Sequence, residues 1–368
     1  MIVVDFLPDI FSQSEPVYSD VDVSIRGELT AVVSDHYAHL ELKVIDVRKS
    51  GEIEINSSNF LVKTDKGTYL LKLFQQLAVD VAGIEQRELL EKQYALMDWL
   101  HGQEVPSPWA IEASTHKYVC DIDSKRSAVL MSFVPGSYFS GAQESVHTVG
   151  DAVGRMHAVL KSIPEDLQLT GEIPSVTLEE KAIFTAMVEN RHTEQGILSA
   201  EHQALLAKNK YFLSTIWDEV LDHEQTYFQS PRGLQHIDLH PHNILMNGSQ
   251  VAAFLDFDSL KLGPLKSMLG FSAFKLLRQV VCASGNSLQV VEQRELVNIY
   301  CDAIFVHLPE LRSDLKSISL FAYAEVCRRI SSIFKLNIVD NNPQWNHVLE
   351  IQIAGLKEIE SLFGPLSC

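Results

Sequence analysis

The sequence has few cysteines, no long apolar run and little positive charge. Its 368 residues include five scattered cysteines, with no CxxC pair and no other metal-ligand spacing. An odd number of cysteines in a chain of this size favours reduced thiols and a cytoplasmic protein. No run of eighteen apolar residues occurs, so no membrane-spanning helix is expected.

The charge balance is strongly acidic. Thirty Lys and Arg residues stand against 48 Asp and Glu residues, which gives a net charge of −18. Nucleic acid and anionic membranes are therefore not expected as partners, because both bind cationic surfaces. A small anionic ligand is compatible with this charge, since a local lysine or a metal ion can offset it. The N-terminal MIVVDFLPDIF lacks a basic start and is interrupted by Asp5 and Asp9, so no secretory signal is expected. The sequence makes no prediction of the oligomeric state.

The first part of the chain is rich in predicted strands. Residues 23–40 have a helical rhythm, and residues 83–101 form an amphipathic helix with Leu90, Tyr94 and Met97 on one stripe. The main strand-like segments are 41–48, 58–64, 68–74 and 127–133. Asp65-Lys66-Gly67 is a hairpin signal between two of them.

After Val134-Pro135-Gly136 the pattern is mostly helical, apart from a strand-and-loop segment at 234–258. We therefore expect an α+β chain with two lobes. Residues 1–133 would form a small antiparallel-sheet lobe with a helical lead-in, and residues 134–368 a larger helical lobe. A ligand site is expected in the cleft between them.

Residues 234–258, LQHIDLHPHNILMNGSQVAAFLDFD, hold the densest set of chemically active side chains. Two short apolar strands flank Asn247-Gly248, which predicts a β-hairpin. Because a hairpin returns its two ends to the same place, Asp238, Asn243 and Asp256 are expected to meet. A carboxylate that orients a hydroxyl, beside an amide and a second carboxylate that suit Mg²⁺, indicates phosphoryl transfer.

HIDLHPHNIL at 236–245 followed by FLDFD at 254–258 resembles the aminoglycoside phosphotransferase and choline kinase-like family. VLMSFVPG at 129–136 and VGDAVGRMH at 149–157 are similar to its interlobe hinge and first large helix. The resemblance covers roughly residues 41–283, and it departs from the family at Ile237, where glycine is usual. It implies a protein kinase-like fold and ATP-dependent phosphorylation of a small-molecule hydroxyl group.

The resemblance also implies roles for individual residues. Asp238 would be the catalytic base, and Asn243 and Asp256 would hold Mg²⁺. His236 would support the catalytic loop, while Asp258 would be a further metal or supporting group.

In such an enzyme the sheet lobe must bind the nucleotide phosphates. Lys72 lies in an apolar strand and is expected to approach Asp256 across the cleft and to contact the α- and β-phosphates of ATP. The helix offers Glu91 and Glu88 as its partner, and the helical period favours Glu91. The connection at 49–59 has one glycine and no GxGxxG pattern, so Ser57 and Ser58 are the candidate phosphate contacts. The hinge around Ser132 and Val134 would bind adenine through its backbone.

Several alternatives stay open. The chain could keep the fold as a catalytically silent, nucleotide-binding pseudokinase, or act on a protein. His236, Asp238, His240 and His242 could instead form the metal site of a hydrolase. The acceptor is not determined by the sequence, and the candidates are an amino sugar, a sugar, choline or ethanolamine, and homoserine or another hydroxy amino acid.

Overall fold

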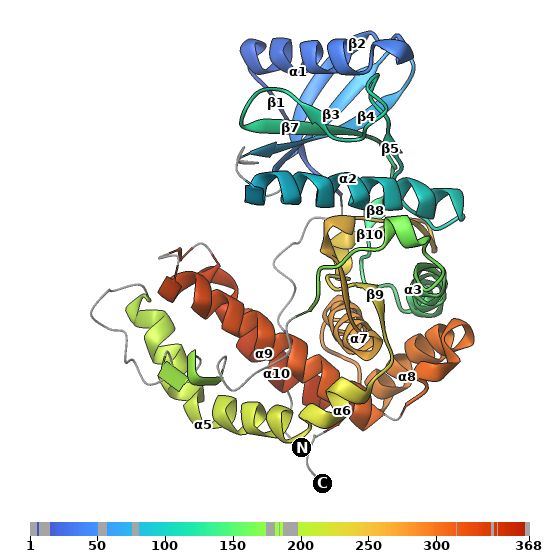
Figure 1. Cartoon of the computed structure of the whole chain (residues 1–368). Helices are drawn as coiled ribbons and strands as arrows, with labels where there is room; N and C mark the ends of the chain where they lie inside the picture. Colours follow the sequence, from blue (N-terminus) through green and yellow to red (C-terminus); the bar gives the residue numbers. More distant parts are fainter. Residues whose placement is uncertain are drawn as a thin grey trace.

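The N-terminal lobe is built on a seven-stranded antiparallel sheet (Figure 1). The computed structural model describes residues 6, 15–50, 57–75, 81–173, 181–183, 185–186, 198–313, 315–339, 342–343 and 345–364. The strand order is β1-β2-β3-β4-β7-β5, and β6 also pairs with β7. The strands are β1 (Tyr18–Asp20), β2 (Val44–Ser50), β3 (Ser57–Thr64), β4 (Thr68–Gln75), β5 (Ala110–Ile111), β6 (Cys120–Asp121) and β7 (Arg126–Ser132).

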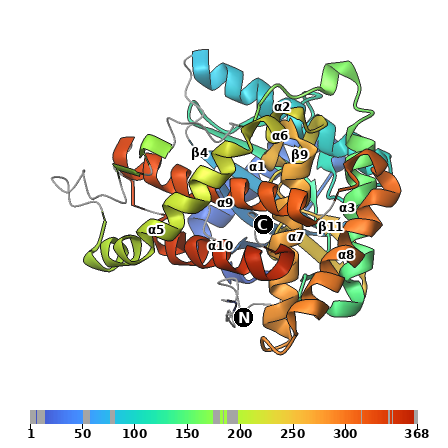
Figure 2. The same ribbon diagram turned by 90° about the horizontal axis from the view of Figure 1, so that it is seen from below.

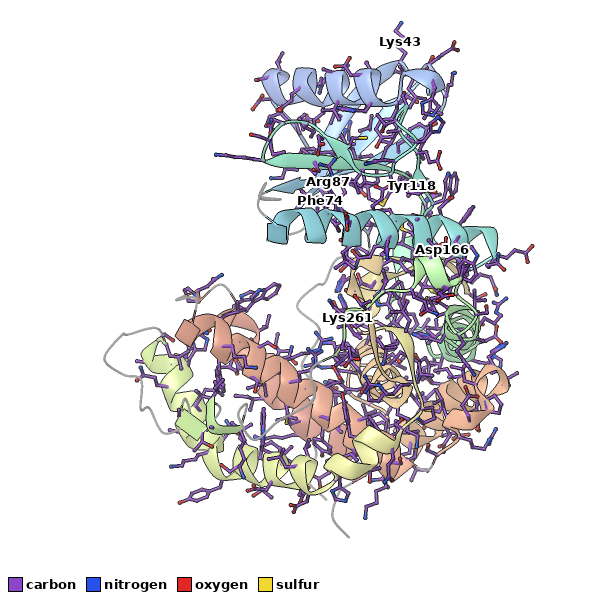
Figure 3. The ribbon with its side chains drawn as sticks, viewed as in Figure 1. Lys43, Phe74, Arg87, Tyr118, Asp166 and Lys261 are labelled. Atoms are coloured by element: carbon purple, nitrogen blue, oxygen red, sulfur yellow. The ribbon has the colours of Figure 1, made fainter. Side chains whose placement is uncertain are left out.

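One helix covers each face of this sheet: α1 (Val23–His36) on one side and α2 (Val81–Gly102) on the other. Side chains alternate between the two faces along a strand. Leu71 and Leu73 of β4 therefore pack against α1, whereas Phe74 packs towards α2 in Figure 3. The same alternation places Lys72 on the α2 side of the sheet.

The C-terminal lobe is helical, and α2 lies between it and the sheet (Figure 1). Helix α3 packs on α8, α7 on α9, and α9 on α10, as the view in Figure 2 shows for the last pair. Gly150 lets α3 approach α8 closely, because a Cβ there would lie 2.6 Å from the Tyr300 carbonyl oxygen. The described helices are α3 (Val146–Leu160), α5 (Ala200–Asp222), α6 (Glu224–Gln229), α7 (Leu265–Ala283), α8 (Val290–His307), α9 (Leu315–Val339) and α10 (Leu349–Phe363).

Two small antiparallel sheets lie where the lobes meet. One has the order β11-β10-β8 and so joins the segment after the hinge to the predicted hairpin. The other pairs β9 with β12 and brings the two ends of the 232–264 segment together. These strands are β8 (Ser137–Tyr138), β9 (Arg232–His236), β10 (Ile244–Asn247), β11 (Gln250–Phe254) and β12 (Leu260–Pro264).

The two-lobed α+β architecture with its antiparallel sheet confirms the sequence prediction. The β9–β12 pair was not predicted, because neither strand has an alternating pattern of its own. The helical sequence pattern after residue 136 includes residues 177–190, which lie largely outside the described residues. The boundary at 133/134 stays a prediction, and β7 ends just before it, at Ser132. No helix in the described ranges combines the length and the apolar character needed to cross a membrane.

Candidate active site

The predicted hairpin is present and brings its two polar ends together. Strands β10 and β11 pair from Ile244 opposite Phe254 to Asn247 opposite Gln250. Beyond the paired strands, the Leu255 N–H donates to the Asn243 carbonyl oxygen at 2.9 Å. The residues on either side of the hairpin, Asn243 and Asp256, are therefore held next to each other.

Asn243 also fixes the loop that carries Asp238. Its side-chain amide donates from Nδ2 to the Asp238 carbonyl oxygen at 2.8 Å, so Oδ1 is the amide atom left to act as a ligand. Asp256 adopts the left-handed backbone conformation, with φ of 60°. A non-glycine residue in this region is strained and is often found at functional sites. Asp238, Asn243 and Asp256 thus lie close together, as expected from the hairpin, and their roles stay predictions.

Two buried histidines, His236 and His157, stabilise the loop that carries Asp238. The His236 ring donates from Nε2 to the Leu255 carbonyl oxygen at 2.7 Å and accepts from the Asp238 N–H at Nδ1, at 3.3 Å. His157 donates from Nδ1 to the Val153 carbonyl oxygen at 2.8 Å and accepts the His236 N–H at Nε2, at 3.2 Å. Each ring uses one nitrogen as donor and the other as acceptor, so both histidines are neutral. His236 therefore supports the loop.

The buried His157 makes stability fall in mild acid. Burial lowers the pKa of His157 from 6.5 to about 4, so the unfolded chain binds more protons between these values. We expect the free energy of unfolding to drop by about 2 kcal/mol from this residue between pH 7 and pH 5. Urea denaturation at both pH values measures the drop, with His157→Gln as the comparison. An equal loss in wild type and in this variant would contradict the assignment.

Asp238 pairs with an arginine that the sequence did not indicate. Arg329 Nη2, from α9, lies 3.0 Å from Asp238 Oδ1 and donates to the Ile237 carbonyl oxygen at 2.9 Å. Burial raises the pKa of Asp238, but the nearby Arg329 guanidinium, together with His240, His236 and Lys275, outweighs burial and holds that pKa well below its usual range. Asp238 is therefore an ionised carboxylate at neutral pH. Its side chain is 30% exposed, so a small acceptor can reach it.

Lys72 connects the sheet lobe to this site. Its ammonium group lies 2.7 Å from Asp258 Oδ2 and 3.6 Å from Asp256 Oδ1, so the expected approach to Asp256 is present. Asp258 is also held by α2, since it accepts a hydrogen bond from Tyr94 and its carbonyl oxygen accepts from Gln93 Nε2 at 3.2 Å. Burial and the neighbouring Asp258 raise the pKa of Tyr94, so its hydroxyl stays a donor. Asp258 is thus a counter-ion of Lys72, a role that the sequence left undecided.

The expected Lys72–Glu91 ion pair is absent from this structure. Both carboxylate oxygens of Glu91 instead accept backbone N–H groups, from Tyr118 and Val119, each at 2.8 Å. Tyr118 lies where the sheet meets α2 in Figure 3. The helical period correctly predicted that Glu91 faces the sheet lobe. Its carboxylate is, however, already bound by the backbone of the segment before β6. Glu88, the alternative, is exposed.

In this structure Glu91 holds the segment before β6 against α2. We expect Glu91→Gln to lower the free energy of unfolding by about 2 kcal/mol, because one charge-assisted bond to a backbone N–H is lost. The KM for ATP is expected to stay within about twofold of wild type, since no phosphate contact is removed. Glu88→Gln is the matched control. A large rise in KM with unchanged stability would restore the predicted pairing with Lys72.

The two candidate phosphate contacts, Ser57 and Ser58, lie on opposite faces of the sheet. Ser57 pairs with Phe74, on the Lys72 face of the sheet, whereas Ser58 pairs with Leu73, on the opposite face that packs against α1. The Ser58 side chain therefore lies on the face away from Lys72, and its contact with the phosphates stays a prediction. Residues 51–56 of the same connection lie outside the described residues.

The hinge also differs in part from expectation. Ser132 exchanges hydrogen bonds with Trp109: its N–H donates to the Trp109 carbonyl oxygen, and its hydroxyl accepts the Trp109 N–H, both at 3.0 Å. Its N–H is thus engaged within the sheet lobe and does not serve adenine. Val134 packs beside Leu245 and Ala253 at the junction of the lobes and stays a candidate adenine contact.

The hydrolase alternative is not supported by the histidine arrangement. His236 uses both ring nitrogens within the protein, and His240 Nε2 lies 3.7 Å from Asp238 Oδ2. Within the described ranges, no three His, Cys, Asp or Glu side chains form a group that could hold a metal ion.

Comparison with known families agrees with this geometry. The sequence profile of the phosphotransferase enzyme family matches residues 52–266, which is more than half of the chain. The chain belongs to this phosphotransferase family. The match runs from the connection before β3 to the start of α7 and so contains β3 to β7 of the sheet lobe, the hinge and the whole 236–258 segment.

Two curated relatives are homoserine kinases. That of Zymomonas mobilis subsp. mobilis is 25% identical over 205 residues, which cover 55% of this chain and 56% of the relative. That of a Bradyrhizobium species is 25% identical over 249 residues, covering 67% and 68%. The chain therefore spans about half the length of the first relatives that it matches.

Solved structures share the fold at low identity. A spectinomycin phosphotransferase, solved with ADP and spectinomycin, matches with a TM-score of 0.60 and 14% identity over 92% of this chain and 97% of its own. The macrolide 2′-phosphotransferase MphH from Brachybacterium faecium matches with a TM-score of 0.53 and 13% identity over 92% and 98%. These likenesses establish the kinase-like fold.

Proposed function

We propose that this phosphotransferase transfers the γ-phosphoryl group of ATP to a hydroxyl group of a small metabolite. The observation that carries the proposal is the joined set of Asp238, Asn243, Asp256 and Lys72, linked by hydrogen bonds and ion pairs across the two lobes. Four such groups at one cleft match the needs of phosphoryl transfer, in which catalysis is mainly positioning and electrostatic stabilisation.

In this proposal Asp238 orients the acceptor hydroxyl group and accepts its proton as the bond to phosphorus forms. The low pKa imposed by Arg329 makes Asp238 a weak base. That property suits a loose transition state, in which the proton leaves late and orientation matters more than base strength.

Asn243 and Asp256 have the donor atoms that Mg²⁺ prefers. Their oxygens are hard ligands, and the bond between Leu255 and Asn243 holds them side by side on either end of the hairpin. We propose that these two residues, with Asp258 as a neighbour, hold Mg²⁺. When bound, the ion would neutralise charge on the phosphate oxygens.

Lys72 would contact the α- and β-phosphates from the sheet lobe. Its present partners, Asp256 and Asp258, keep its charge paired while it is only 8% exposed. Ser57, on the same face of the sheet, is the candidate contact from the connection before β3, and Val134 is the candidate at the adenine side.

Homoserine or a similar hydroxy amino acid is the first candidate acceptor. Two homoserine kinases are 25% identical to this chain, over 205 and 249 residues. Amino sugars, sugars, choline and ethanolamine remain in the panel to be tested. We also propose a cytoplasmic location, in keeping with described cysteines that form no disulfide.

The test is ADP release from Mg-ATP with a panel of these acceptors. We expect acceptor-dependent ADP release by the wild type, with L-homoserine among the active acceptors. Nucleotide binding without ADP release for any acceptor would contradict the proposal and favour a pseudokinase. No nucleotide binding at all would contradict both.

A further inference from the structure

Arg329 does more in this structure than neutralise one carboxylate. Its Nη2 atom is shared between the Ile237 carbonyl oxygen and Asp238 Oδ1. Its guanidinium carbon lies 3.9 Å from the centre of the Phe271 ring, so a cation–π contact also holds the group in place. A fixed arginine fork beside the catalytic carboxylate is well placed for bidentate or charge-assisted recognition of an anion.

The same guanidinium has donors that the described protein does not use. Its Nε is buried and has no hydrogen-bond partner, and Nη1 also makes no hydrogen bond within the described ranges. Unlike Nε, Nη1 is not buried. It is accessible to solvent, in agreement with a side chain that is 22% exposed. Nη1 therefore offers a solvent-accessible cationic donor directly beside Nη2, the atom that pairs with Asp238.

Resting on the proposed phosphotransferase function, we infer that Arg329 binds a carboxylate group of the acceptor. The acceptor hydroxyl must lie within hydrogen-bond reach of Asp238, and an anion on Nη1 must lie within reach of the same guanidinium. The separation of the two groups on the acceptor is then limited to two hydrogen-bond lengths plus the span from Asp238 to Nη1, roughly 11 Å in all. A hydroxyl and a carboxylate three carbon atoms apart, as in a short hydroxy acid or hydroxy amino acid, fit this separation.

Charge supports an anionic acceptor at this point. The net charge of −18 does not itself attract a carboxylate, so the attraction comes from the cations around Asp238. Lys275 also lies close enough to Asp238 to lower its pKa, so a second cation stands near the same carboxylate. An acceptor whose only charge is an amine gains nothing from a guanidinium donor. The arrangement therefore selects hydroxy acids over neutral or purely cationic alcohols.

The experiment compares matched acceptors that differ only in the carboxylate. We expect wild type to prefer L-homoserine over L-homoserinol, in which a hydroxymethyl group replaces the carboxylate, by about 10- to 100-fold in kcat/KM. In Arg329→Met this preference should fall to about twofold or less. Because Arg329 also positions Asp238, kcat should drop for both acceptors, and Arg329→Lys should restore part of the preference. Arg312→Met, at an exposed ion pair on α8 and the segment that follows it, is the control.

The deciding quantity is the ratio between the two acceptors, which a merely structural role of Arg329 would leave unchanged. An unchanged ratio in a folded Arg329→Met variant overturns the inference, and so does equal use of both acceptors by wild type. Turnover of choline or sugars alone would also overturn it while leaving the proposed function intact. Calorimetry with L-2-aminobutyrate, which has the carboxylate and no hydroxyl group, distinguishes failure of the proposed function from failure of the carboxylate site. Absence of ADP release contradicts the function, whereas equal binding of L-2-aminobutyrate to wild type and Arg329→Met contradicts the carboxylate site.

Discussion

Replacing Asp238 with asparagine is expected to lower kcat by about 10²- to 10⁴-fold, the range that a positioned general base contributes. Asparagine has nearly the same shape, but it cannot accept the proton of the acceptor hydroxyl. It also leaves the Arg329 charge unpaired. The KM for ATP should change little, because the nucleotide contacts come from Lys72 and the hairpin ends. Steady-state kinetics with Mg-ATP and the active acceptor measure both parameters.

The control for this variant is a direct measurement of nucleotide binding. Asp238→Asn should bind a non-hydrolysable ATP analogue with wild-type affinity and should melt cooperatively. Wild-type turnover by this variant would show that another group accepts the proton. Loss of both binding and folding would show that Asp238 mainly supports the loop.

Replacing Asp256 with asparagine is expected to lower kcat/KM by about 10²-fold or more, because a carboxylate ligand of the proposed Mg²⁺ site is lost. The concentration of Mg²⁺ needed for half-maximal activity should rise at the same time. Asparagine tolerates the left-handed backbone conformation that Asp256 adopts, so backbone strain does not confuse the result. Kinetics at several Mg²⁺ concentrations measure the change.

Asp258→Asn is the matched comparison, since Asp258 pairs with Lys72 at 2.7 Å and lies on the same loop. Its main expected effect is on the KM for ATP, through a less well positioned Lys72, with a smaller change in the Mg²⁺ requirement. If the two variants showed the same Mg²⁺ dependence, the assignment of Asp256 as the main metal ligand would be wrong.

The site residues that the sequence predicted well lie close together along the chain or on one hairpin. Asp238, Asn243 and Asp256 are held by local pairing, and the Asn247-Gly248 turn identifies that pairing. The turn at Asp65-Lys66-Gly67 likewise sets the register of β3 and β4. That register could have shown that Ser57, and not Ser58, shares a sheet face with Lys72.

Arg329 could not be placed from sequence, because it lies 91 residues beyond Asp238, which it contacts. The available signal was a pair of adjacent arginines within an apolar helix, FAYAEVCRRISSIF. Charged side chains in such a helix are usually paired, but the pattern does not identify the partner. The predicted pairing of Glu91 with Lys72 was not found for a related reason. Helical periodicity predicts the direction in which the Glu91 side chain leaves α2, but the tertiary fold decides which hydrogen-bond donor it meets.

The most direct test of the account is a ³¹P NMR experiment on wild-type protein with Mg-ATP and L-homoserine. Transfer to an alcohol predicts a new phosphomonoester resonance that grows in step with ADP and disappears in Asp238→Asn. Growth of inorganic phosphate in place of a phosphomonoester, with this acceptor and with every other in the panel, would contradict the account.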